Sequence, residues 1–121
     1  LEKFLSTALA ACRPALLDDP LNLNDLVVQC YPAGSFGITA HRDHVRYTGL
    51  VALILLSGAG RFFVAETRDG SAAREIPWRP GEVMLMRAPG FAGRDDRPYH
   101  YLSDISSKRY SIGLRQDTQA A

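Results

Sequence analysis

Apolar side chains at the start of the chain recur every three or four residues. Over residues 1–12 this spacing predicts an amphipathic helix that ends before Pro14. A second short helix is expected over residues 14–17, because proline suits the first turn of a helix and the proline-containing turn at 18–20 would end it. We therefore expect residues 1–20 to form a helical segment that packs on the rest of the domain.

After residue 25 the pattern changes to short apolar runs separated by Gly, Pro and Asp. The expected strands are residues 26–31, 38–43, 49–57, 61–66, 73–78, 83–86, 99–102 and 109–115. Residues 58–60, with the sequence Gly-Ala-Gly, are interpreted as a hairpin turn. Residues 88–97, rich in glycine and charge, are interpreted as a loop that forms a mobile lid.

Many short strands after an N-terminal helix are typical of an antiparallel sandwich or barrel. The predicted fold class is mainly β, a double-stranded β-helix (jelly roll) over residues 25–116 with one or two N-terminal helices. Alternate inward-facing residues of such a fold can build a cavity at one mouth. All 121 residues are expected to form a single domain, since this is an ordinary length for one core.

The composition narrows the class of protein without identifying a partner. A net charge of +1 gives no reason to expect nucleic-acid binding. The longest apolar run, residues 50–56, is too short to cross a bilayer, and no signal peptide is visible. Cys12 and Cys30 have no metal-ligand spacing, so we expect buried free thiols in a cytoplasmic protein.

Two potential metal ligands lie close together in the expected strand 38–43. His41 and Asp43 are two residues apart, so in a strand both side chains point to the same face. A second histidine would complete the set of two His and one carboxylate with which non-haem iron(II) oxygenases bind metal and keep other positions open. His44 falls on the opposite strand face, so His100 is the better candidate.

The last expected strand alternates between polar and apolar side chains. One face holds Arg109, Ser111, Gly113 and Arg115, and the other holds Tyr110, Ile112 and Leu114. If the polar face lines the interior, its arginines need an anionic partner, because an unpaired buried charge is costly. A guanidinium group suits a carboxylate, since it offers a two-pronged donor fork. The pattern is equally compatible with arginines that are solvated at a sheet edge.

Further polar and aromatic side chains are candidates for a binding pocket. Gln29 and Tyr31 share a strand face and can hydrogen-bond a polar ligand, although a half-buried strand pair would look the same. The basic residues expected near the mouth are Arg87, Arg94 and the candidate substrate-pocket residues Arg42, His44, Arg46 and Arg97. These either attract an anionic substrate or are solvated loop charges. Trp78, Phe62 and Phe63 either line the pocket or belong to the core.

In order along the chain, these motifs resemble those of the iron(II)/2-oxoglutarate-dependent dioxygenase superfamily. The resemblance covers residues 26–116 and lies in Tyr31-Pro32, His41-x-Asp43, His100 and Arg109-x-Ser111. It implies an enzyme with Fe(II) bound by His41, Asp43 and His100, which uses 2-oxoglutarate and O2 to hydroxylate a substrate and forms succinate. The residues it implies for 2-oxoglutarate are Arg109, Ser111, Tyr31, Gln29 and Arg115.

Two subfamilies look closest, and they imply different substrates. Residues 30–32 and 41–44, together with Arg109-x-Ser111, look like the small-molecule oxygenases related to isopenicillin N synthase and plant hydroxylases. Residues 97–100 and 109–116 are also similar to the AlkB-type nucleic-acid demethylases, whose last strand carries two arginines six residues apart. In that type the first arginine holds the distal carboxylate of 2-oxoglutarate, and the second approaches the iron-side carboxylate.

The chain departs from the AlkB type in several places. That type usually has Asn where Gln29 and Ser111 stand, an acidic residue where Val45 stands, and a substantial N-terminal nucleotide-recognition lid. We therefore expect a small-molecule or protein side-chain substrate rather than nucleic acid, and no membrane partner. The AlkB-like demethylase is the first alternative, and a non-catalytic cupin-like metal- or ligand-binding module is the second.

Overall fold

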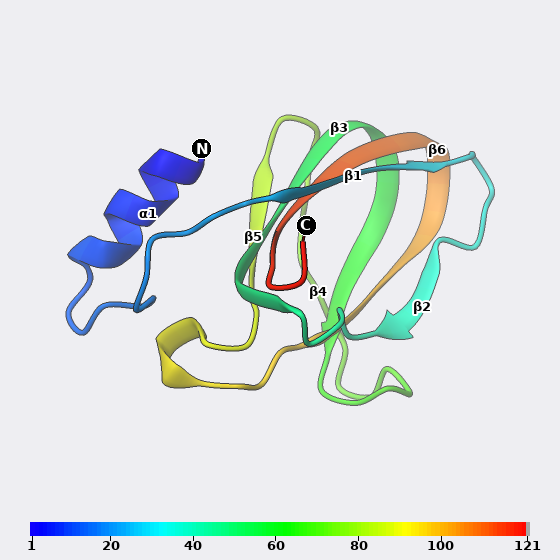
Figure 1. Ribbon diagram of the computed structural model, residues 1–121. Coiled ribbons are helices and arrows are strands. Elements are labelled where there is room, and N and C mark those ends of the chain that lie inside the picture. Colours follow the sequence, from blue (N-terminus) through cyan, green and yellow to red (C-terminus); the bar gives the residue numbers. More distant parts are fainter. Residues whose placement is uncertain (121) are drawn as a thin grey trace.

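The computed structural model describes residues 1–120 and shows one α-helix followed by β-structure (Figure 1). Helix α1 spans Glu2–Ala11, as the apolar spacing predicts. The strands are β1 (Asp25–Tyr31), β2 (Ile38–His41), β3 (Tyr47–Ala65), β4 (Arg74–Glu75), β5 (Val83–Arg87) and β6 (Tyr99–Asp117), with a 3-10 turn at Phe91–Gly93. The second helix expected over 14–17 is wrong. This segment is an irregular loop, and its Leu17 packs beside α1 instead.

The strands form two antiparallel layers that share β3 and β6. In one layer β1 pairs with the second half of β6, which pairs with the first half of β3, and this in turn pairs with β5. In the other layer β2 pairs with the first half of β6, and β4 with the second half of β3. Figure 1 shows the strong curvature of both long strands. This arrangement confirms the predicted jelly roll.

Both shared strands are 19 residues long, so the predicted hairpin at 58–60 and the separate strands 99–102 and 109–115 are wrong. The register between β3 and β6 shifts repeatedly between Leu55 and Arg61, so irregularities face one another across the pair. Gly58 (φ +88°) and Asp104 (φ +53°) take left-handed conformations there. A bulge bends a strand and exchanges its faces without ending it. A glycine-rich segment therefore carries the chain from one layer into the other.

Gly58 has no room for a side chain, which allows a test of this bend. A Cβ atom at this position would lie 2.1 Å from the carbonyl oxygen of Lys108, whereas Gly81 has a similar φ (+89°) and open space. We expect Gly58→Ala to lower the free energy of unfolding by at least about 3 kcal/mol, and Gly81→Ala by only about 1 kcal/mol. Urea denaturation measures both, and equal losses would contradict the close approach.

Two apolar clusters hold the fold together. The main core lies between the layers and is built from the buried residues Val51, Leu53, Phe62, Met86, Ala88, Leu102 and Ile105. A second cluster joins α1 to the start of β3 through Leu5, Leu21 and Leu50. The expectation of buried thiols is wrong for Cys30, which is exposed on β1, and Cys12 is half-buried. Within residues 1–120, no helix is long and apolar enough to span a membrane.

Candidate metal centre

Strand pairing brings His41 and His100 together. The two residues are direct Cα partners in the antiparallel pair of β2 and β6, and their ring centroids are 4.2 Å apart. Residues opposite one another in such a pair project to the same face. The two imidazoles therefore meet because of the register, although 58 residues separate them in the chain.

A one-residue irregularity turns His41 toward the interior. Ile38 pairs with Leu102, but His41 pairs with His100, so β2 advances three residues while β6 advances two. In a regular strand Ile38 and His41 would face opposite sides. Here both line the same pocket, because the bulge inverts the alternation between them.

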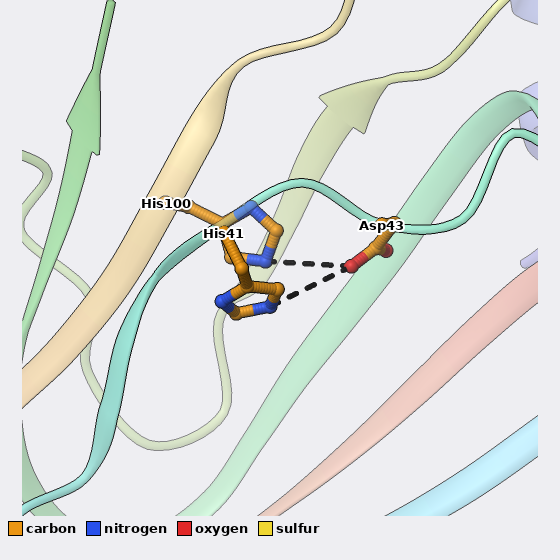
Figure 2. A group of neighbouring side chains, drawn as sticks. All are labelled: His41, Asp43 and His100. Atoms are coloured by element: carbon orange, nitrogen blue, oxygen red, sulfur yellow. Dashed lines mark ion pairs between the residues drawn. The ribbon is translucent and has the colours of Figure 1, made fainter. Parts of the chain in front are cut away.

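Asp43 reaches the histidines from a loop. The predicted strand 38–43 is wrong at its end, because β2 stops at His41 and Asp43 lies beyond it. Its Oδ1 atom lies 3.8 Å from Nε2 of His41 and 3.5 Å from Nε2 of His100. Figure 2 shows both contacts as dashed lines. The Nε of Arg97 donates a 2.8 Å hydrogen bond to the Asp43 carbonyl oxygen and fixes the loop. The three predicted ligands therefore converge on one point.

The donor atoms suit a divalent metal ion. Nδ1 of His41 lies 2.8 Å from the carbonyl oxygen of Thr39, which can only accept, so this contact favours the neutral tautomer with its proton on Nδ1 and a lone pair on Nε2. Arg115 donates from Nε to Oδ2 of Asp43 at 3.1 Å and leaves Oδ1 free. Ligands about 2.1 Å from one ion lie about 3 to 3.5 Å apart, close to the separations between Oδ1 and the two Nε2 atoms. These residues fit the iron(II) that the sequence resemblance implies.

Burial lowers the pKa of His100 from 6.5 to about 4, and the nearby Asp43 carboxylate only partly offsets this. His100 is 6% exposed, so its neutral form prevails at neutral pH, as a metal ligand requires. Below pH 6.5 the unfolded chain takes up a proton on this imidazole that the folded chain accepts only near pH 4. The unfolded state therefore binds more protons in this window, and stability falls as the pH falls.

We accordingly expect the metal-free protein to lose up to about 3 kcal/mol of unfolding free energy between pH 6.5 and pH 4 through His100. Urea denaturation at several pH values measures the slope. A His100→Leu variant lacks the titrating group, so its stability should depend less steeply on pH over the same range. Identical slopes for the two proteins would contradict a strongly depressed pKa.

Arg109 presents a buried cation to the same pocket. It is 3% exposed, its guanidinium lies 4.7 Å from the centre of the Trp78 ring, and its Nε has no hydrogen-bond partner. Within residues 1–120 no carboxylate lies within ion-pair distance of it. Desolvation lowers the pKa of Arg109, and the Tyr31 hydroxyl partly opposes this. A buried, unpaired guanidinium calls for an anionic ligand.

The other residues predicted for 2-oxoglutarate divide into two groups. Gln29, Tyr31 and Ser111 line the pocket with Arg109, because β1 and β6 pair Gln29 with Ser111 and Tyr31 with Arg109. Arg115 lines the pocket as well, but its hydrogen bond goes to Asp43. Arg115 therefore contacts a predicted metal ligand directly. Sequence patterns contain no signal for this contact, nor for the Thr39 carbonyl that orients His41.

The basic residues predicted near the mouth of the cavity fall into two groups. Arg42 and Arg97 line a cleft beside the metal centre, together with Arg87 and Arg94. His44 is exposed and accepts the backbone N–H of Arg46, and Arg46 makes a two-pronged ion pair with Asp117. Within the described chain, neither of these two lines the pocket or the cleft. Arg74, which sequence reasoning missed, does line the cleft.

The aromatic candidates and the predicted lid have different surroundings. Phe62 and Trp78 line the pocket and contact each other edge to face, whereas Phe63 stacks on Tyr101 and does not line the pocket.

In the loop 88–97, Phe91 packs in the cluster around α1, and Asp96 pairs with Arg87 and Arg94. The mobility of this loop stays a prediction.

Comparison with known proteins supports the fold. No family model and no curated protein match the chain. Among solved structures, a prolyl hydroxylase from Trichoplax adhaerens, in complex with a peptide fragment of the hypoxia inducible factor oxygen degradation domain, matches with a TM-score of 0.59 and 17% identity. The match covers 97% of this chain and 56% of that chain, so this chain spans little more than half the length of the hydroxylase. At this identity the likeness concerns the jelly-roll fold.

Proposed function

We propose that the protein is an iron(II)- and 2-oxoglutarate-dependent dioxygenase that hydroxylates its substrate. One observation carries this proposal: His41, Asp43 and His100 converge on a pocket that also holds the buried, unpaired guanidinium of Arg109. A metal-binding module without turnover would need the three converging ligands but not the buried guanidinium. An oxygenase needs both, because the co-substrate brings its own carboxylate to the metal.

Different residues of the chain would bind the metal and 2-oxoglutarate. Nε2 of each histidine and Oδ1 of Asp43 would hold the metal, and Arg115 would keep the carboxylate turned toward it. The Arg109 fork would bind the far carboxylate of 2-oxoglutarate, with the Ser111 hydroxyl as a second donor. When bound, iron(II), 2-oxoglutarate and O2 supply the oxidising chemistry, which yields succinate, CO2 and the hydroxylated product.

A protein side chain is the substrate that we favour. The solved prolyl hydroxylase of the same fold holds a peptide fragment. This likeness supports a side chain of a peptide as the substrate, and the same chemistry would also hydroxylate a small free substrate.

The test is succinate formation from 2-oxoglutarate under air. Purified protein loaded with iron(II) is expected to release succinate, at a low rate without substrate and faster when a hydroxylatable peptide is added. Mass spectrometry of the peptide should then show a gain of one oxygen atom. Absence of succinate from a folded, iron-loaded protein would overturn the proposal and favour the cupin-like binding module.

One contact favours the AlkB-like demethylase as a second candidate. Arg115 lies six residues after Arg109 and contacts the metal-site carboxylate of Asp43, as a second functional arginine on the last strand would. The test is incubation of the iron-loaded protein with methylated single-stranded DNA. Formaldehyde release would favour demethylation, and its absence alongside succinate formation with a peptide would favour hydroxylation.

A further inference from the structure

A basic cleft borders the metal centre. Five arginines line it, namely Arg42, Arg74, Arg87, Arg94 and Arg97, with only two carboxylates, Glu66 and Asp96. Arg42 stands between His41 and Asp43 in the chain, and Nε of Arg97 donates to the carbonyl oxygen of Asp43. A group bound in this cleft would therefore lie next to the reactive position.

The positive charge of the cleft is not neutralised from within. Asp96 is shared by two guanidinium groups, those of Arg87 and Arg94, each at 2.8 Å. Within the described residues, neither Arg42 nor Arg74 has a carboxylate within ion-pair distance. Several like charges gathered in one hollow repel one another, and an anionic ligand relieves that repulsion. The charge pattern points to a ligand with at least one anionic group.

An apolar hollow adjoins the basic one. It is lined by Phe62, Val64, Ile76, Met84 and Met86, and it shares Arg74, Arg87 and Pro98 with the cleft. Phe62 also lines the metal pocket and stacks 5.8 Å from His100. Apolar side chains therefore run from the metal site to the arginines. A ligand that follows this path carries an apolar group next to its anionic group.

We propose that this cleft binds a carboxylate of the substrate, carried beside an apolar group. The inference rests on the proposed function and deepens it, since it names the chemistry of the substrate. Carboxylates match the guanidinium fork, and a single acidic side chain or a free hydrophobic acid fits a short cleft. Substrate specificity would then come from Arg42 and Arg74, which have no carboxylate partner of their own in the described chain.

Nucleic acid fits this surface less well. Binding of single strands relies on aromatic side chains on which bases stack. Within the described residues, no aromatic side chain lines the basic cleft. The neighbouring Tyr99 ring already has the guanidinium groups of Arg42 and Arg68 within 4.2 and 5.6 Å of its centre. Asp96 and Glu66 would also repel a continuous phosphate backbone.

Fluorescence anisotropy of the full chain without metal tests the proposal. The probes are a fluorescein-labelled hexapeptide of alternating Leu and Glu, the same peptide with Gln in place of Glu, and a labelled single-stranded DNA 10-mer. The Glu peptide should bind at least about tenfold more tightly than the Gln peptide, and its affinity should fall with added salt. If decanoate displaces the labelled Glu peptide, the carboxylate belongs to a free hydrophobic acid. If decanoate does not displace it, the carboxylate belongs to a peptide side chain. Equal affinity for both peptides, or tighter binding of DNA, overturns the proposal.

Charge-reversal variants locate the site. Arg42→Glu and Arg74→Glu should each weaken binding of the Glu peptide about tenfold. Arg79→Glu is the matched control, because Arg79 lies outside the cleft with its side chain 87% exposed, so its binding should stay within about twofold of the parent. Arg74→Gln, with circular dichroism of every variant, separates lost charge from lost folding. Equal weakening by Arg79→Glu overturns the assignment to the cleft.

These measurements are independent of turnover. If the iron-loaded protein forms no succinate, the proposed function fails, while anisotropy in the metal-free chain still reports whether the cleft selects a carboxylate. If succinate forms but the Glu and Gln peptides bind equally, only the inference about the substrate fails. The two failures are therefore distinguishable.

Discussion

His41→Ala is expected to reduce succinate formation from 2-oxoglutarate by at least about 100-fold. The variant loses one of three predicted ligands, and the neighbouring His44 is exposed and does not belong to the group of converging ligands. Loss even of a group that merely orients a ligand commonly costs 10- to 100-fold in metal affinity or activity, so loss of a ligand itself costs more. Succinate release under air and equilibrium dialysis with Mn²⁺ measure the two consequences.

His44→Ala is the matched control for this prediction. It removes an imidazole three residues along the chain, whose Nδ1 accepts a hydrogen bond from the backbone N–H of Arg46. We expect its succinate formation and Mn²⁺ affinity to remain within about twofold of the parent, as for an ordinary surface substitution. An equally large loss in His44→Ala, or full activity in His41→Ala, would contradict the assignment of the metal ligands.

Arg109→Met is expected to act in opposite directions on binding and on stability. Without a ligand, the guanidinium is buried and unpaired, so replacing it with an apolar side chain of similar length should stabilise the ligand-free protein by about 1 to 2 kcal/mol. The same change removes the donor fork for the far carboxylate of 2-oxoglutarate. The dissociation constant of 2-oxoglutarate should rise about 30- to 100-fold, because this factor corresponds to the loss of one charge-assisted pair.

Urea denaturation of the metal-free protein and titration with 2-oxoglutarate in the presence of Mn²⁺ measure these two effects. Arg109→Lys is the informative control, because it keeps the charge but loses the planar fork. It should weaken 2-oxoglutarate binding by about tenfold without the gain in stability. If Arg109→Met destabilises the ligand-free protein and leaves 2-oxoglutarate binding unchanged, Arg109 is a structural residue and the proposed co-substrate site is wrong.

The pairing of strands explains why the site is compact although its parts are distant in sequence. β6 supplies His100 and Arg109, and a residue with left-handed backbone, Asp104, lies between them. Arg109 lies nine positions after His100, and in a regular strand an odd interval places side chains on opposite faces. The bend at Asp104 changes that alternation, so that both side chains line one pocket.

The sequence alone carried the local information. Helical spacing predicted α1, and the chemistry of two histidines and one carboxylate predicted which residues would meet. Alternation from Arg109 to Arg115 separated a polar face from an apolar one, but only the structure shows that Arg109 and Ser111 of the polar face are buried. These predictions held because the periods of a helix and a strand are properties of neighbouring residues. Even so, the aspartate was placed in a strand that ends two residues earlier, at His41.

Only the tertiary structure decided what depends on register. Gly58 looked like a hairpin turn because glycine serves turns and bulges equally well, and only the pairing of β3 with β6 distinguishes them. The cross-strand meeting of His41 with His100, the contact between Arg115 and Asp43, and the row of arginines in the cleft arise in the same way. The physical reason is that a strand repeats every two residues, so a single extra residue exchanges its faces, and no local pattern records where that residue lies.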